Sequence, residues 1–129
     1  MENLIKSVIE FNNAYKLPVR NKPSNVDHKE QELNYDLMLE ELNEYDKAMD
    51  EGDLVEIADA LGDQLYILIG NIVKHGLQDK IENIFNAIHK SNMSKLDEEG
   101  NPIYNLQGKV VKGPNYKNPT EEIKKELGL

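Results

Sequence analysis

Apolar side chains recur at helical spacing in four long runs of this chain, and polar or proline-containing breaks separate the runs. Asp27 and Asp53 each precede a run and have a glutamate three residues later, which is the pattern of an N-terminal capping box. Gly76 is placed to end the third run. We therefore expect helices over residues 2–15, from Asp27 to about Met49, from Asp53 to His75, and over roughly 78–94, with a short closing helix from Pro119 to Leu127.

The helical pattern disappears between Asp97 and Pro119, where glycine, proline and asparagine accumulate. This segment is expected to be a loop with a short hairpin through Ile103-Tyr104 and Val110-Val111. The predicted fold class is all-α: a bundle of four main helices, followed by a C-terminal loop or short hairpin and a closing helix. We expect residues 1–129 to form a single domain.

The amino-acid composition of the chain excludes several classes of protein. The chain has 129 residues, 39% hydrophobic and 30% charged, which is typical of a globular protein. It has no cysteine, which excludes a disulfide framework, and its strongest apolar stretch, Leu65 to Ile69, is too short to span a bilayer. The start of the chain lacks a signal-peptide pattern, so a cytoplasmic location is expected. The net charge of −9 disfavours binding to nucleic acid.

Carboxylates fall on the apolar arc of the second predicted helix. When the residues are placed at 100° intervals, Glu41 and Glu44 fall inside the arc that Leu33, Leu37 and Met38 cover, and Glu40 lies at the edge of the arc. A carboxylate on a core-facing stripe costs free energy unless a positive group compensates it. Buried unpaired carboxylates are rare, so this row predicts a cation site.

The third predicted helix carries another acidic row. Glu56, Asp59 and Asp63 are spaced i, i+3, i+7 and share one stripe. Two antiparallel helices with facing carboxylate rows would suit magnesium, which prefers oxygen ligands and substrate phosphates. Taken alone, the row on the third helix is also what a solvated face looks like, and that alternative stays open. A di-iron bundle would need Glu-x-x-His motifs, and the three histidines lie at no such spacing.

The two acidic segments, Glu40-Glu41-Leu42-Asn43-Glu44 and Glu56 to Asp63, resemble the all-alpha nucleoside triphosphate pyrophosphohydrolases. That superfamily includes MazG, phosphoribosyl-ATP pyrophosphohydrolase and the dimeric dUTPases, and the MazG-like, phosphoribosyl-ATP-pyrophosphohydrolase-like branch is the most similar. The resemblance covers nearly the whole chain, because it extends to Val8-Ile9-Glu10-Phe11, Leu17-Pro18, Tyr66, residues 91–95 and residues 108–114.

This resemblance implies a MazG-like bundle and magnesium-dependent cleavage between the α and β phosphates, with manganese as an alternative metal. The family's E-x-x-E motif falls on Glu41 and Glu44. Its later E-x-x-D motif either falls on Glu56 and Asp59 or ends at Asp63, in which case Ala60 occupies its first acid position. The catalytic candidates are Glu40 and Glu41, and the metal candidates are Glu41, Glu44, Glu56, Asp59 and Asp63.

Basic residues could meet the substrate's phosphates. The segment from Gly100 to Asn118 carries Lys109, Lys112 and Lys117 and no acid, although a solvated basic loop would look the same. Asn92 and Lys95 resemble phosphate-contacting positions of the family, and Tyr66 could stack on a base or pack in the core. The substrate-binding candidates are Asn92, Lys95, Lys109, Lys112 and Tyr66.

The sequence thus predicts a nucleotide pyrophosphohydrolase that forms a homodimer or a homotetramer, because the third helix is too apolar for a small monomeric bundle. Two alternatives remain. A catalytically weak nucleotide-binding or regulatory protein of the same fold would explain Ala60, and a plain interaction module would be insensitive to magnesium. The base and the sugar of the substrate are not determined by these residues.

Overall fold

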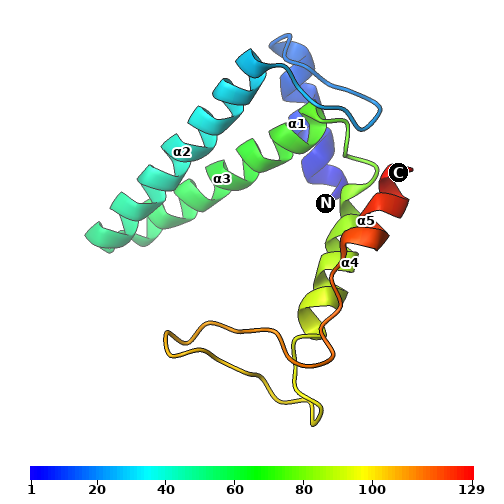
Figure 1. Cartoon of the computed structure of the whole chain (residues 1–129). Helices are drawn as coiled ribbons and strands as arrows, with labels where there is room; N and C mark the ends of the chain where they lie inside the picture. The colour runs from blue at the N-terminus through cyan, green and yellow to red at the C-terminus, as the bar shows by residue number, and fades with distance from the viewer. The chain divides into compact units, whose positions relative to one another are not determined.

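The computed structural model describes residues 1–129 and contains five α-helices and no β-strand. The helices are α1 (Glu2–Ala14), α2 (His28–Glu51), α3 (Leu54–Lys74), α4 (Ile81–Met93) and α5 (Thr120–Leu127) (Figure 1). The all-α prediction is confirmed, and each expected helix begins and ends within a few residues of its predicted bounds. No helix combines the length and the apolar character that a membrane crossing requires.

The chain divides into two compact units, Met1–Asp79 and Lys80–Leu129. The first unit contains α1, α2 and α3. The second contains α4, α5 and the long loop between them. That all 129 residues form one domain stays a prediction.

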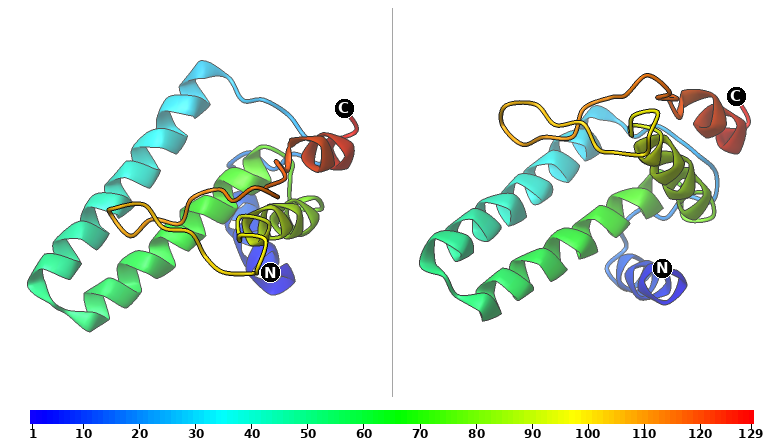
Figure 2. Two further views of the ribbon diagram at one scale, coloured as in Figure 1. Left: turned by 60° about the horizontal axis from the view of Figure 1, so that its bottom comes forward. Right: turned by 90° about the horizontal axis from the view of Figure 1, so that it is seen from below.

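In the first unit, α2 and α3 run antiparallel along each other, and α1 packs against α3 (Figures 1 and 2). Gly52 ends α2 with a φ of 65°, and the Asp53 side chain then accepts hydrogen bonds from the amides of Val55 and Glu56. This tight connection makes successive turns of α2 face successive turns of α3. Acidic residues on the two helices are thereby brought opposite each other.

The core of the first unit lies where α1 meets the C-terminal half of α3. Val8, Ile69 and Val73 are 2%, 2% and 0% exposed. The apolar face that carries Leu61, Leu65 and Leu68 is different, because each of these side chains is more than 40% exposed. Within the first unit, therefore, α1 and α2 leave this face of α3 uncovered.

The predicted capping box at the start of α2 is only half right. The Asp27 carboxylate accepts a hydrogen bond from the Glu30 amide at 2.8 Å, as expected. The Glu30 carboxylate, however, accepts two hydrogen bonds from the Arg20 guanidinium, at 2.7 and 3.0 Å, and this pairing lowers the pKa of Glu30. Arg20 also donates to the carbonyl oxygen of Lys74 at 2.6 Å, so the ion pair ties the loop before α2 to the end of α3.

In the second unit, α4 and α5 lie side by side (Figure 2). The Ser91 hydroxyl donates to the carbonyl oxygen of Lys117 at 2.7 Å, which returns the loop to α4. The expected hairpin is present in its shortest form, as one antiparallel bridge between Tyr104 and Val110. Gly113 packs so closely on the backbone after α4 that a Cβ there would lie 2.4 Å from the Leu96 carbonyl oxygen.

Candidate metal and nucleotide site

Three carboxylates from α2 and α3 converge in the first unit. One oxygen from each of Glu41, Glu44 and Asp63 lies within 4.8 Å of the other two. Glu41 and Glu44 are one turn apart on α2, and Asp63 reaches them from α3. The structure thus brings together members of both acidic rows from the sequence.

The three carboxylates of this cluster repel one another when all of them are ionised. Burial and the negative charges of Glu44, Asp63 and Glu40 raise the pKa of Glu41 from 4.5 to about 7. Burial, with Asp59 and Glu44, also raises the pKa of Asp63. One Glu41 oxygen, Oε2, is buried and has no hydrogen-bond partner. Such a cluster requires protons or a cation to offset its charge.

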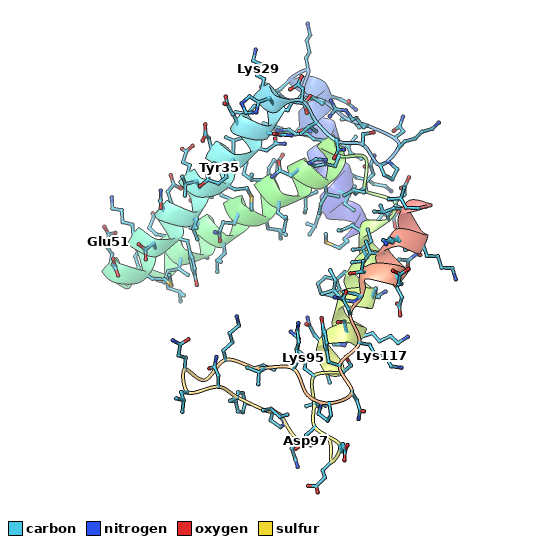
Figure 3. The ribbon with its side chains drawn as sticks, viewed as in Figure 1. Lys29, Tyr35, Glu51, Lys95, Asp97 and Lys117 are labelled. Carbon is cyan, nitrogen blue, oxygen red and sulfur yellow. The ribbon has the colours of Figure 1, made fainter.

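A cavity of about 560 Å³ adjoins the cluster at the closed end of the α2–α3 hairpin. Glu44 belongs to both the cluster and the cavity wall, and Glu56 and Asp59 line the cavity from α3. Glu51, which Figure 3 labels near the end of α2, lines it too. Glu40 belongs to neither group and is exposed next to Glu41.

Sequence reasoning missed Lys47, whose side chain lines the same cavity and lies 4.0 Å from the Glu51 carboxylate. The periodicity assigns Lys47 to the solvated side of α2, one turn beyond Glu44. Its i+3 spacing from Glu44 was the only signal for it in the sequence. A single cation among so many acids matters because it is the one side chain there that attracts phosphate.

The substrate-binding candidates fall into separate places. Asn92, Lys95 and Lys109 line a pocket of about 480 Å³ in the second unit, and the bridge at Val110 helps to form it. Figure 3 shows Lys95 directly after α4. Lys112 does not line this pocket, and its ammonium lies 4.7 Å from the centre of the Tyr116 ring.

Tyr66 belongs to the first unit. Its ring contacts Phe11 edge-on, with ring centroids 5.5 Å apart, and both residues line a small cavity among α1, α2 and α3. The two rings are each 39% exposed, so neither is fully buried in the core. Both rings thus remain accessible to a ligand.

The three histidines lie outside the candidate site. His75 caps α3, with its Nδ1 placed 2.8 Å from the Ser24 carbonyl oxygen, and His28 pairs with Glu32 on the surface. His89 is exposed on α4. None of them lies in the carboxylate cluster.

The sequence matches one known protein family. The family described as phosphoribosyl-ATP pyrophosphohydrolase matches residues 8–92, a span that includes every carboxylate of the site. The chain belongs to this family. Members of the phosphoribosyl-ATP pyrophosphohydrolase family hydrolyse a phosphoric anhydride bond in a nucleotide, and the chain is a pyrophosphohydrolase of that kind.

The fold is similar to that of a candidate NTP pyrophosphohydrolase from Exiguobacterium sp. 255-15, whose crystal structure is known. The two share 19% sequence identity with a TM-score of 0.50, and the match covers 98% of this chain and 94% of the other. At that identity the likeness concerns the fold alone. The search of curated proteins found no match.

Proposed function

We propose that this member of the phosphoribosyl-ATP pyrophosphohydrolase family is a magnesium-dependent nucleoside triphosphate pyrophosphohydrolase. It would cleave between the α and β phosphates and release a monophosphate and pyrophosphate. The observation that carries the proposal is the convergence of Glu41, Glu44 and Asp63 from two antiparallel helices. A net charge of −9 also favours a cation between the protein and a triphosphate, because it would reduce the repulsion between them.

A divalent cation fits the residues present. The donor set consists of carboxylate oxygens, and the buried Glu41 Oε2 lacks a partner that a cation would supply. Glu41, Glu44 and Asp63 would hold one ion, with Glu56 and Asp59 available for a second one beside Glu44. When bound, magnesium neutralises phosphate charge and polarises the phosphorus–oxygen bond.

The chain's own residues would supply the remaining chemistry. Glu40 is exposed and precedes Glu41 in the chain but does not belong to the cluster. Its carboxylate would therefore be available to accept the proton of the attacking water. Lys47 in the hairpin cavity would meet the distal phosphates as a point charge. Lys95, Lys109 and Asn92 line a pocket in the second unit and stay proposed phosphate contacts.

A panel assay tests the proposal. The purified protein would be offered canonical and modified triphosphates with magnesium, and pyrophosphate release would be measured for wild type, Glu41→Gln and Glu44→Gln. Glu32→Gln is a matched control, because Glu32 lies on the exposed side of α2 and pairs with His28. Nucleotide binding without turnover in wild type would instead favour a regulatory protein of this fold. Insensitivity of both stability and binding to magnesium would remove the proposal altogether.

We further propose that the protein is a homodimer or a homotetramer. Leu61, Leu65 and Leu68 form an apolar face of α3 that one chain does not cover. Burying such a face against a second copy would recover hydrophobic free energy. The expected cytoplasmic location stays a prediction.

A further inference from the structure

A buried polar pair joins α2 and α3 at the end of the hairpin opposite Gly52, which we call the open end. The Lys74 ammonium donates a hydrogen bond to Asn34 Oδ1 at 2.9 Å, and the two residues are only 5% and 8% exposed. No other hydrogen bond links side chains of these two helices. Lysine is rarely buried to this extent. The chain thus keeps a charged group in the interior where an apolar one of similar size would pack at lower cost.

The pair belongs to a network of charged groups at the open end. Burial lowers the pKa of Lys74, and the Glu30 carboxylate, one turn before Asn34 on α2, offsets part of this effect. Glu30 is held by the Arg20 guanidinium, which also donates to the Lys74 carbonyl oxygen. The network therefore connects the first two turns of α2 to the last residue of α3.

Lys74 and Asn34 share their helix faces with the carboxylates of the cluster. Asn34 precedes Glu41 by seven residues on α2, and Lys74 follows Asp63 by eleven residues on α3. At 100° per residue, the members of each pair differ by only about 20° around the helix axis, and they lie about 10 Å apart along α2 and about 16 Å apart along α3. A helix moves as one body over two or three turns. A bond between Lys74 and Asn34 therefore fixes both the rotation and the axial position of one acidic row against the other.

The remaining contacts between the two helices determine the register less strictly. The connection at Gly52 joins their near ends but leaves rotation and separation at the open end free. Apolar packing is not directional, and the carboxylates of the cluster repel one another until a cation binds. A hydrogen bond weakens steeply with distance and angle, so a slide or a rotation would leave a buried ammonium without its acceptor. A single buried polar residue fixes the register of coiled coils for the same reason.

We propose that Lys74 is a positioning residue whose buried hydrogen bond to Asn34 fixes the register of α3 against α2. The bond holds Asp63 opposite Glu41 and Glu44, so that the carboxylate cluster is formed before a cation binds. This inference rests on the proposed function, since the cation site is part of it.

Replacing both partners by apolar residues separates positioning from stability. In Lys74→Met/Asn34→Leu no polar group of the pair is left buried and unpaired, so the fold should be about as stable as that of wild type. Asn34→Asp keeps an acceptor for the ammonium and is the conservative variant. Lys29→Met, at an exposed position of α2 that Figure 3 labels, is the control for the loss of one positive charge. Urea denaturation would establish that each protein folds.

Two measurements report the state of the site. Titration with Mn²⁺, with the free ion counted by electron paramagnetic resonance, gives the cation affinity. Methyl NOEs between Leu37 and Ile67, which line one small cavity from α2 and α3, report the register in the metal-free protein.

We expect the double variant to bind Mn²⁺ at least about 10-fold more weakly than wild type, with the NOE between Leu37 and Ile67 weakened or lost. Asn34→Asp should keep both properties. The direction of the change is informative, because the loss of a positive charge alone should strengthen cation binding slightly, as Lys29→Met should show.

A folded double variant that binds Mn²⁺ as tightly as wild type would overturn the inference. Weaker binding with an unchanged NOE would overturn it as well, because the effect would not then act through the register. If the double variant does not fold, Asn34→Gln replaces it, since its amide oxygen is displaced by one carbon and the same two outcomes apply. No Mn²⁺ binding by wild type, together with a lost NOE in the double variant, would remove only the proposed function.

Discussion

Glu41 and Asp63, on consecutive antiparallel helices, hold carboxylate oxygens within 4.8 Å of each other. Burial is the main reason that the pKa values of both groups are raised, and neighbouring carboxylates add to it: Glu44 and Asp63 act on Glu41, and Asp59 and Glu44 act on Asp63. The folded chain therefore stores an electrostatic cost at this point. The cation site that we propose here would offset this cost.

Glu41→Gln should abolish turnover and at the same time stabilise the metal-free protein. Above about pH 7, where Glu41 is ionised, the amide removes one negative charge from the cluster, which we expect to raise the free energy of unfolding by about 1 kcal/mol after allowance for solvent screening. Pyrophosphate release should fall by about 100-fold or more, because a ligand is lost. Urea denaturation in the presence of a chelator measures the first effect. If Glu41→Gln and the control Glu32→Gln behaved alike in both measurements, the cluster would have no special role.

The stability of the metal-free protein should fall as the pH rises from about 4.5 to about 7. The folded protein keeps a proton on Glu41 up to about pH 7, whereas the unfolded chain releases it near pH 4.5. Because the folded state binds more protons in this window, raising the pH favours unfolding. The contribution is fully present below about pH 4.5 and is lost above about pH 7.

Denaturation curves at several pH values, in a chelator, measure this dependence. In Glu41→Gln the slope should become much shallower. Saturating magnesium should also remove it, since the ion replaces the proton. A slope that stays the same in the variant would assign the effect to other groups.

Lys95→Ala and Lys109→Ala should each raise KM for a triphosphate by about 10-fold, because each lysine lines the pocket that we propose for phosphate contacts. Lys112→Ala should have a smaller effect, since Lys112 is engaged with Tyr116. Lys125→Ala, an exposed change on α5, is the control. Steady-state kinetics with varied substrate would show the difference. If all four lysine variants had the same KM, the substrate would not bind in this pocket.

Two glycines offer a matched pair of stability tests. A Cβ at Gly76 would lie 2.0 Å from the Lys22 carbonyl oxygen, and its φ is 72°. We expect Gly76→Ala to destabilise the protein by about 2 kcal/mol or more. Gly62, in the middle of α3, has open space around it, and Gly62→Ala should stabilise by about 1 kcal/mol through helix propensity. Thermal denaturation of both variants measures these effects. Similar melting temperatures for Gly76→Ala and Gly62→Ala would contradict the close contact between residues 22 and 76.

Sedimentation should show a dimer or a tetramer that Leu65→Glu dissociates. Leu65 is 41% exposed in one chain and lies in the centre of the uncovered face of α3. A charge there would be buried without a partner if two copies meet on this face. Tyr35→Glu, on an exposed part of α2 that Figure 3 labels, is the control. A monomeric wild type would remove the oligomer proposal.

The sequence by itself determined the helices, because helical periodicity and its stop signals are local. Asp27, Asp53, Gly52 and Gly76 act through the backbone of neighbouring residues, and the predicted boundaries are correct for that reason. The same local logic placed the acids of α2 and α3 on definite stripes. It could not show where the Glu30 carboxylate goes, since its partner Arg20 lies ten residues away on a loop.

Only the tertiary structure decided which acids meet. The register between α2 and α3 places Asp63 against Glu41 and Glu44, and leaves Glu56 and Asp59 around the neighbouring cavity with Lys47. Likewise, a return of the loop over Gly113 brings Lys109 to Lys95 and leaves Lys112 with Tyr116. Periodicity gives the direction of a side chain about its own helix axis. The distance between side chains on different elements depends on how those elements pack.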